Sequence, residues 1–261
     1  MVKGIKQFVL PVVLSCWSFL AAAETAPIIK IAMPEDFYPF YAVERDGTPT
    51  GASYEIAAAV LEKLGYAPQV TQYSDMRGAL QSMASGSQDL MVNLTPTPDR
   101  DKLALFTSTP HIYETQDFIA RADSPIEYNG RLLSVAQFKI GVNYGWTYGP
   151  EFDATHYLTK APVLDSMAQL KGLLSGTFDL AINNQQYFLS SAEKLGVSNA
   201  FKVLTPSVYV LPVNLAVSRR MQGAEAFRDQ LEREVAEFIS TPEYLLILSK
   251  YGFKPRAETA Q

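Results

Sequence analysis

The stretch that decides the fold is Asp89-Leu90-Met91-Val92-Asn93-Leu94, which is followed directly by Thr95-Pro96-Thr97-Pro98-Asp99-Arg100. The first part has the apolar composition of a buried strand. The second part brings hydroxyl groups, a predicted helix start and one arginine to the carboxyl end of that strand. In open α/β sheets, ligands bind in the crevice beyond the carboxyl ends of the strands. The stretch therefore predicts an α/β fold with a ligand site at this point.

The residue types after the strand suit an anion. Thr97 is a predicted N-cap, Pro98 suits the first helical position and Asp99 suits the first turn. Free N–H groups and the dipole at a helix start favour negative charge. Arg100 adds a planar guanidinium that can hold a carboxylate through two hydrogen bonds. A capped helix start with a solvated arginine is the alternative, and these six residues alone do not decide between the two.

Strand and helix patterns alternate along the rest of the chain, which predicts parallel pairing. Four of the five helices end near glycines, and the two halves repeat one pattern, Ser85–Leu90 in the first and Ser175–Leu180 in the second. The predicted strands are 28–33, 69–73, 89–94, 139–143, 178–183 and 214–218, and the predicted helices are 51–64, 76–84, 166–174, 224–239 and 242–251.

The N-terminus has the three parts of a secretory signal. Lys3 and Lys6 precede the apolar segment Phe8–Leu20, and Ala21-Ala22-Ala23 supplies an A-x-A cleavage site. The alternative, an uncleaved anchor, is disfavoured because the segment is shorter than the roughly 20 residues of a spanning helix and contains Pro11. We predict that residues 1–23 are a cleaved signal peptide and that the protein works in the periplasm.

Cys16 is the single cysteine. The residues before it only loosely resemble a lipoprotein cleavage box, and cleavage there would leave Trp17–Leu20 as an apolar mature end, so lipidation is not expected. Cleavage after Ala23 removes the cysteine, which excludes disulfides and thiol catalysis.

Composition and motifs exclude several classes of protein. The net charge of −5 argues against nucleic-acid binding. The sequence has no GxGxxG or GxxxxGK[ST] phosphate loop and no GxSxG nucleophile elbow. The two histidines, His111 and His156, lack the spacing of metal ligands. We expect neither a metal nor a cofactor.

A series of motifs from about Ile29 to Phe253 resembles one family, the family 3 periplasmic solute-binding proteins that serve polar amino acid ABC importers. No single motif is decisive, but their order and spacing are similar throughout. The motifs are Phe37-Tyr38-Pro39-Phe40, Gly51–Ile56, Leu80–Gly86 with Asp89, Thr95–Arg100 with Phe106-Thr107, Ile140–Val142 with Gly145–Thr147, and Gly176–Asp179. In the second of these, Ala52 and Ser53 depart from the family pattern.

The resemblance implies a type II periplasmic-binding-protein fold, in which two α/β lobes, each a mainly parallel sheet flanked by helices, close on a ligand cleft. Lobe 1 would comprise residues 24–117 and 213–261, and lobe 2 residues 118–212. The implied function is capture of a small carboxylate-bearing solute, an amino acid or a derivative, for an ABC permease in the inner membrane. Such a protein is a monomer and performs no chemistry.

The family's binding positions carry over one at a time. Arg100 matches the arginine that clamps the α-carboxylate, and Thr95 a hydroxyl beside it. Asn93 matches a position whose backbone contacts the α-amino group. Phe37 matches an aromatic residue packed over the ligand, although core packing is the alternative for this side chain.

Further matches lie around the predicted cleft. Thr147 matches a second-lobe hydroxyl that helps to hold the carboxylate, and the Trp146 backbone is a further donor. Tyr73 stands where a side-chain-pocket residue would project, or it packs on the lobe surface. Glu55 falls at a helix start, where the dipole alone explains an acid.

The main departure is Asn184, where the family has an acid that pairs with the ligand's ammonium group. Loss of a charge-assisted hydrogen bond would cost about 1.5–3 kcal/mol of binding free energy. Three explanations remain open: another acid compensates, the ligand is not a standard amino acid, or the alignment is displaced by one residue. The next acid along the chain is Glu193.

Two other functions stay open. A periplasmic enzyme similar to the cyclohexadienyl dehydratases would need a general acid in the cleft, and the candidates are Glu35, Asp36 and Glu55. A ligand-sensing receptor would act by docking to a membrane partner.

Overall fold

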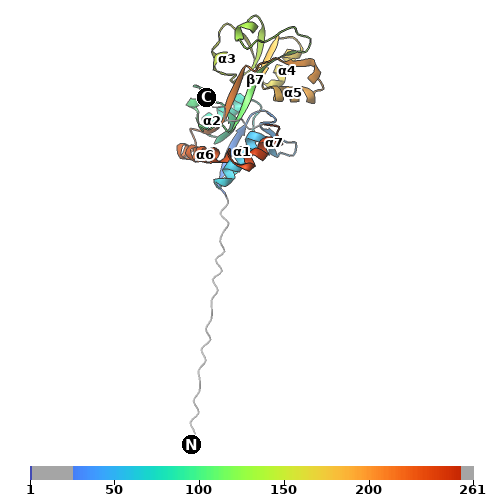
Figure 1. The fold of residues 1–261 in the computed structure, drawn as a ribbon. Helices are drawn as coiled ribbons and strands as arrows, with labels where there is room; N and C mark the ends of the chain where they lie inside the picture. Colours follow the sequence, from blue (N-terminus) through green and yellow to red (C-terminus); the bar gives the residue numbers. More distant parts are fainter. Residues whose placement is uncertain (2–25, 254–261) are drawn as a thin grey trace.

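The computed structural model describes Met1 and residues 26–253. Apart from Met1, the predicted signal peptide and Cys16 lie outside the described residues. Figure 1 shows two lobes with the strands β7 (Ile112–Arg121) and β12 (Tyr209–Ser218) running between them. This confirms the two-lobed α/β fold class. The predicted lobe boundaries fall within these two strands.

Lobe 1 is built on a sheet with the strand order β4-β1-β5-β12. The strands β1, β4 and β5 are parallel, as predicted, and β12 is antiparallel to β5. The elements are β1 (Ile28–Met33), β2 (Ala42–Val43), β3 (Pro49–Thr50), α1 (Ala52–Lys63), β4 (Ala67–Gln72), α2 (Met76–Ser85), β5 (Leu90–Leu94), β6 (Ala104–Phe106), α6 (Ala224–Phe238) and α7 (Pro242–Lys250).

Lobe 2 continues the sheet from β7 in the order β10-β8-β9, and the pairs β8–β10 and β8–β9 are parallel. The helices α3, α4 and α5 all belong to this lobe (Figure 1). The elements are β8 (Lys139–Asn143), α3 (Pro150–Ala154), β9 (Thr159–Val163), α4 (Ser166–Leu174), β10 (Leu180–Asn183), α5 (Gln185–Lys194) and β11 (Phe201–Val203).

Each lobe has its own hydrophobic core. In lobe 1, α1 buries Ile56 and Val60, which pack in one cluster with Leu231 and Phe238 of α6. In lobe 2, a separate cluster forms around side chains such as Ile140. Among residues 26–253, no helix combines the length and the apolar character needed to cross a bilayer.

The same local devices recur in both lobes, as the repeated sequence pattern predicts. In lobe 1, Asp75 caps α2 by accepting from Gly78 N at 2.8 Å, and Asp89 Oδ2 accepts from Lys30 N at 2.9 Å. In lobe 2, Asp165 caps α4 by accepting from Ala168 N at 2.7 Å, and Asp179 Oδ2 accepts from Lys139 N at 2.9 Å. Each cap contributes about 1 kcal/mol of stability. The two lobes therefore share a scaffold, not only a fold class.

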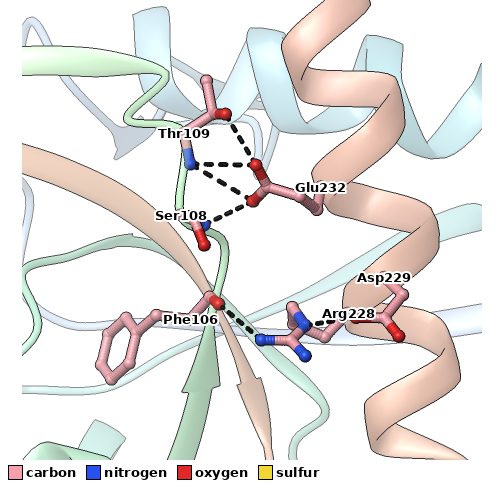
Figure 2. Close-up of polar contacts among 6 residues, drawn as sticks. All are labelled: Phe106, Ser108, Thr109, Arg228, Asp229 and Glu232. Atoms are coloured by element: carbon pink, nitrogen blue, oxygen red, sulfur yellow. Dashed lines mark hydrogen bonds and ion pairs between the residues drawn. The ribbon is translucent and has the colours of Figure 1, made fainter.

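The strands between the lobes pair with each other in antiparallel register from Val213↔Ile112 to Tyr209↔Gln116. The chain that enters β7 is fixed to lobe 1 by Glu232 of α6 (Figure 2). This carboxylate accepts from the backbone N–H groups of Ser108 and Thr109 and from Thr109 Oγ1, the last at 2.7 Å. Arg228, one turn earlier, donates to Phe106 O at 3.4 Å. The lobe 1 end of β7 is therefore firmly anchored.

The α-helix predicted to begin after β5 is not present among the described residues. Arg100–Lys102 form a single 3₁₀ turn, and Thr97 Oγ1 accepts from Arg100 N at 3.3 Å. The turn cannot extend, because Ala104–Phe106 already pair with β12 as the strand β6. A full helix dipole is therefore lacking here, and any preference for an anion at this point rests on Arg100 itself.

Candidate functional site

A narrow cavity lies where the carboxyl end of β5 faces lobe 2. Its empty space is about 350 Å³, including its opening to solvent. Both lobes and the strand β7 contribute to its wall. The lining residues are Phe37, Tyr41, Met76, Asn93, Leu94, Thr95, Arg100, Glu114, Trp146 and Thr147. Six of the eight predicted binding residues meet here, and only Tyr73 and Asn184 do not.

Arg100 joins the two lobes. Only 7% of its surface is exposed, and its guanidinium donates to Thr95 O at 2.8 Å and to Gly145 O of lobe 2 at 2.7 Å. Burial lowers the pKa of Arg100 to about 10, so the side chain remains positively charged at neutral pH. A guanidinium has five N–H donors, and donors remain for an anionic group in the cavity.

Glu114 is the site residue that sequence reasoning missed. It lies on β7 and is 9% exposed. Burial raises the pKa of its carboxyl group to about 7, although the positive charge of Arg100 and hydrogen bonding by the Asn93 and Gln116 side chains oppose the shift. Gln116 Nε2 donates to Glu114 Oε1 at 3.1 Å. Asn93 lies close enough for its amide to interact with the Glu114 carboxylate, but neither Glu114 Oε2 nor Asn93 Oδ1 accepts a hydrogen bond of normal geometry from any described residue, although both oxygen atoms are buried.

Aromatic side chains close one side of the cavity. Phe37 of lobe 1 meets Trp146 edge-on at 5.1 Å between ring centroids and Tyr187 at 4.7 Å. It also stacks on Phe40 at 4.8 Å. Phe37 thus lines the cavity and packs in the core at once, so the two roles considered for it coexist. The contacts of Phe37 with Trp146 and Tyr187 cross between the lobes and hold them together.

The predicted hydroxyl donors already have protein acceptors. Thr95 Oγ1 donates to Pro212 O at 3.0 Å, and Thr147 Oγ1 donates to Asp153. The backbone N–H of Trp146 donates to Asn143 O at 3.3 Å. In this arrangement all three groups shape the wall of the cavity, and their predicted contacts with a ligand remain predictions.

Asn184 lies outside the lining of this cavity. It is 2% exposed and caps α5, since its Oδ1 accepts from Tyr187 N at 3.1 Å. Its Nδ2 donates to Thr115 O on β7 at 3.1 Å. Both ends of the amide are therefore used within lobe 2 and the crossing strand.

Two other predicted residues also lie elsewhere. The Tyr73 ring packs against the cluster of α2 that contains Met83. Glu55 accepts from Tyr251 Oη at 2.5 Å and pairs with Lys250 Nζ at 2.6 Å on the side of α1 that faces α7.

A second crevice between the lobes contains Glu35 and Asp36 beside Tyr187 and Lys194. Burial raises the pKa of Glu35 to about 7. Its Oε2 accepts from Ser166 N of lobe 2 at 3.4 Å. Asp36 Oδ1 accepts hydrogen bonds from Val43 N at 3.0 Å and from Gln72 Nε2 at 2.6 Å. Glu35, with its raised pKa, is therefore a candidate general acid in the crevice between the lobes.

Within the part of the chain that the structure describes, no three His, Cys, Asp or Glu side chains are grouped as a metal site. His111 is fully buried, and burial lowers its pKa to about 3, so it is neutral.

Comparisons with known proteins agree with this architecture. The sequence profile of the bacterial extracellular solute-binding proteins, family 3, matches residues 29–254. No curated protein sequence matches the chain.

Among solved structures, the substrate-binding protein of an amino acid ABC transporter is 20% identical, with a TM-score of 0.71 over 86% of this chain and 98% of that one. A histidine kinase sensor domain with similarity to periplasmic binding proteins is 19% identical, with a TM-score of 0.73 over 87% and 96%. The ancestral amino acid-binding protein AncCDT-1, a precursor of cyclohexadienyl dehydratase, is 18% identical, with a TM-score of 0.69 over 87% and 95%. At these identities the likeness shows a shared fold.

Proposed function

Since this chain belongs to family 3 of the bacterial extracellular solute-binding proteins, we propose that it captures a small carboxylate-bearing solute, an amino acid or a derivative, between its lobes. The observation that carries the proposal is Arg100, a buried cation at the wall of the cavity, bonded to both lobes. A buried arginine with free donors is suited to a planar carboxylate. Closure of the two lobes around such a group excludes water and strengthens the contact.

The test is a thermal-shift screen of amino acids, polyamines and small carboxylates on the mature protein, followed by calorimetry. A ligand that binds the native state raises the unfolding temperature with concentration. We expect stabilisation by amino acids. Stabilisation by polyamines alone would contradict the proposal, since Arg100 would repel them.

Delivery to an ABC permease is the role that we propose for the captured solute. Its support is the family and the similarity to a substrate-binding protein of an amino acid ABC transporter. Loss of uptake of the identified ligand after deletion of the gene would support this role. Unchanged uptake together with a lost transcriptional response would favour a sensor, the function of the histidine kinase domain with the same fold.

One observation favours an enzyme as the second candidate. Glu35 and Glu114 both have pKa values raised to about 7 by burial, which suits a general acid at neutral pH. The fold is shared with a dehydratase precursor. Incubation with a prephenate-like compound tests this, because dehydration and decarboxylation would produce an aromatic absorbance. Binding without turnover excludes it for that substrate.

We also propose export to the periplasm by cleavage after Ala23. N-terminal sequencing of the periplasmic fraction should begin at Glu24, and a chain that starts at Cys16 or retains Met1 would contradict this.

A further inference from the structure

We propose that Glu114, together with Asn93 Oδ1, binds a cationic group of the solute opposite Arg100, so that the site selects a zwitterion with an uncharged side chain. This inference rests on the proposed function, because it assigns the chemical class of the solute held in the same cavity. It places the cation site on the strand β7 between the lobes and not at Asn184.

Two buried acceptors at the cavity wall have unused hydrogen-bonding capacity. A buried oxygen atom that accepts no hydrogen bond costs free energy, and native proteins leave few of them. Glu114 Oε2 and Asn93 Oδ1 are both in this condition among the described residues, and both side chains line the same cavity. Two unsatisfied acceptors, one of them a carboxylate, are complementary to a group with several N–H donors and a positive charge.

Glu114 and Arg100 line the same cavity with opposite charges. Their opposite charges attract, yet Arg100 donates to the carbonyl groups of Thr95 and Gly145 and forms no ion pair with Glu114 in the described structure. A buried pair that is kept apart leaves each charge unneutralised, which is costly. A zwitterion between them would neutralise both, with its carboxylate at Arg100 and its ammonium group at Glu114.

The other two candidates for a cation partner near this position, Asp117 and Asn184, are engaged by protein groups. Asp117, on the same strand, accepts from Thr115 Oγ1 at 2.7 Å and from Gln185 N at 3.3 Å. Asn184 is occupied by its cap and by Thr115 O. Among the described residues that line the cavity, Glu114 is the only acid.

The charges of the lining define the rest of the solute. Among the described residues of this lining, Arg100 and Glu114 are the only charged ones, and the remaining wall includes Met76, Leu94 and Trp146. No other described residue of this wall carries a charge that could pair with a charged side chain of the solute. Neutral, largely apolar amino acids therefore fit, whereas arginine and glutamate carry a charge without a partner.

The experiment compares Glu114→Gln with the wild type by calorimetry. The probes are the neutral L-amino acid that binds the wild type most tightly, its deaminated carboxylate, and L-arginine. Glutamine keeps the size of the side chain and an acceptor for Gln116, and it removes only the charge. We expect the amino acid affinity to fall about ten- to a hundredfold in the variant. The deaminated carboxylate should bind the variant as tightly as the wild type, or more tightly. Glu62→Gln, at an exposed position of α1, is the control for net charge.

The outcomes separate this inference from the proposed function. If the wild type binds no amino acid and no carboxylate, the proposed function fails. If the wild type binds an amino acid and Glu114→Gln binds it equally well, only the assignment of Glu114 fails. If L-arginine binds more tightly than every neutral amino acid, the assigned solute class is wrong.

A pH series on the wild type provides a readout that needs no variant. Binding of a cation requires the ionised carboxylate, so the amino acid affinity should fall by about tenfold per pH unit below neutrality. The charged or titratable groups that face Glu114 are Arg100, Tyr41 and Tyr148, and none of them titrates in this range. Glu35 does, at the other crevice, and the Glu114→Gln profile separates its contribution. An affinity for the amino acid that does not change between pH 5 and 8 would overturn the proposal.

Discussion

The two lobes use the same scaffold but contribute different chemistry to the cavity. Both have an aspartate cap, a helix, a glycine turn and a parallel strand fixed by a second aspartate. Lobe 1 and β7 provide Arg100, Asn93 and Glu114, whose hydrogen-bonding capacity is only partly used. Lobe 2 provides Trp146 and the Gly145 carbonyl, which already accepts from Arg100 at 2.7 Å. We therefore expect lobe 1 and β7 to discriminate between solutes and lobe 2 to cover them.

The largest effect that we expect comes from Arg100→Ala. Removal of the carboxylate clamp should weaken binding at least thirtyfold, which corresponds to about 2 kcal/mol or more. Calorimetry with the amino acid identified in the screen measures it. Lys102→Ala, at an exposed residue two positions away, is the control. Unchanged affinity in Arg100→Ala would mean that the arginine only links the two lobes and does not bind the solute.

The next effect concerns stability without ligand. Burial raises the pKa of Glu114 from 4.5 to about 7, so the folded state holds its proton more tightly than the unfolded chain does. The wild type therefore loses stability as the pH rises from about 4.5 to about 7. Glu114→Gln does not lose this contribution, and at pH 8 it should be more stable than the wild type by about 1–2 kcal/mol.

The measurement is denaturant unfolding of both proteins at pH 5 and pH 8. The stabilisation should appear at pH 8 and shrink at pH 5. A variant that is less stable than the wild type at pH 8 would show that the ionised carboxylate has a structural partner.

A smaller effect on affinity should follow from Trp146→Ala, on the lobe 2 side of the cavity. Its loss removes the edge-on contact with Phe37 and should weaken binding by about fivefold, or 1 kcal/mol. The preference for an amino acid over its deaminated carboxylate should be unchanged, because the discriminating charges lie elsewhere. Tyr157→Ala, at an exposed aromatic residue of lobe 2, is the control. A changed preference would mean that lobe 2 also discriminates.

The smallest effect on affinity is expected from Asn184→Asp. An aspartate keeps the cap on α5, loses the donation to Thr115 O, and adds a charge outside the cavity lining. We expect less than a threefold change in affinity for both an amino acid and a simple carboxylate. A clear gain for the amino acid alone would restore the role that the family resemblance implies for this position.

Local signals made much of the scaffold predictable. The bounds of β8 and α4 agree with the predictions to the residue, because a short apolar strand and a helix that follows Asp165 are encoded by their own residues. The first half of β12 was missed, since Pro212 is atypical of a paired strand. The strand β7 was missed because polar side chains interrupt its first half and its pairing with β12 is long-range.

The candidate site divides in the same way. Arg100 follows its strand within one motif and was found. Glu114 faces the cavity only through the register of β7 against β12, which no local pattern reveals. The sequence also does not show which of its acidic residues will be buried. The polar residue Thr115 follows Glu114 and a second acid, Asp117, lies on the same strand, so no local pattern singled Glu114 out.

The bond from Arg100 to Gly145 O has a kinetic consequence. Gly145 has a φ of 79°, and a side chain there would lie 3.4 Å from Met76 across the gap, so this is a point of close approach between the lobes. Because this bond ties the lobes together, we expect a solute to enter only after the lobes separate and the bond opens. Association is then gated by opening and not by diffusion. In stopped-flow experiments, the observed rate should level off at high solute concentration.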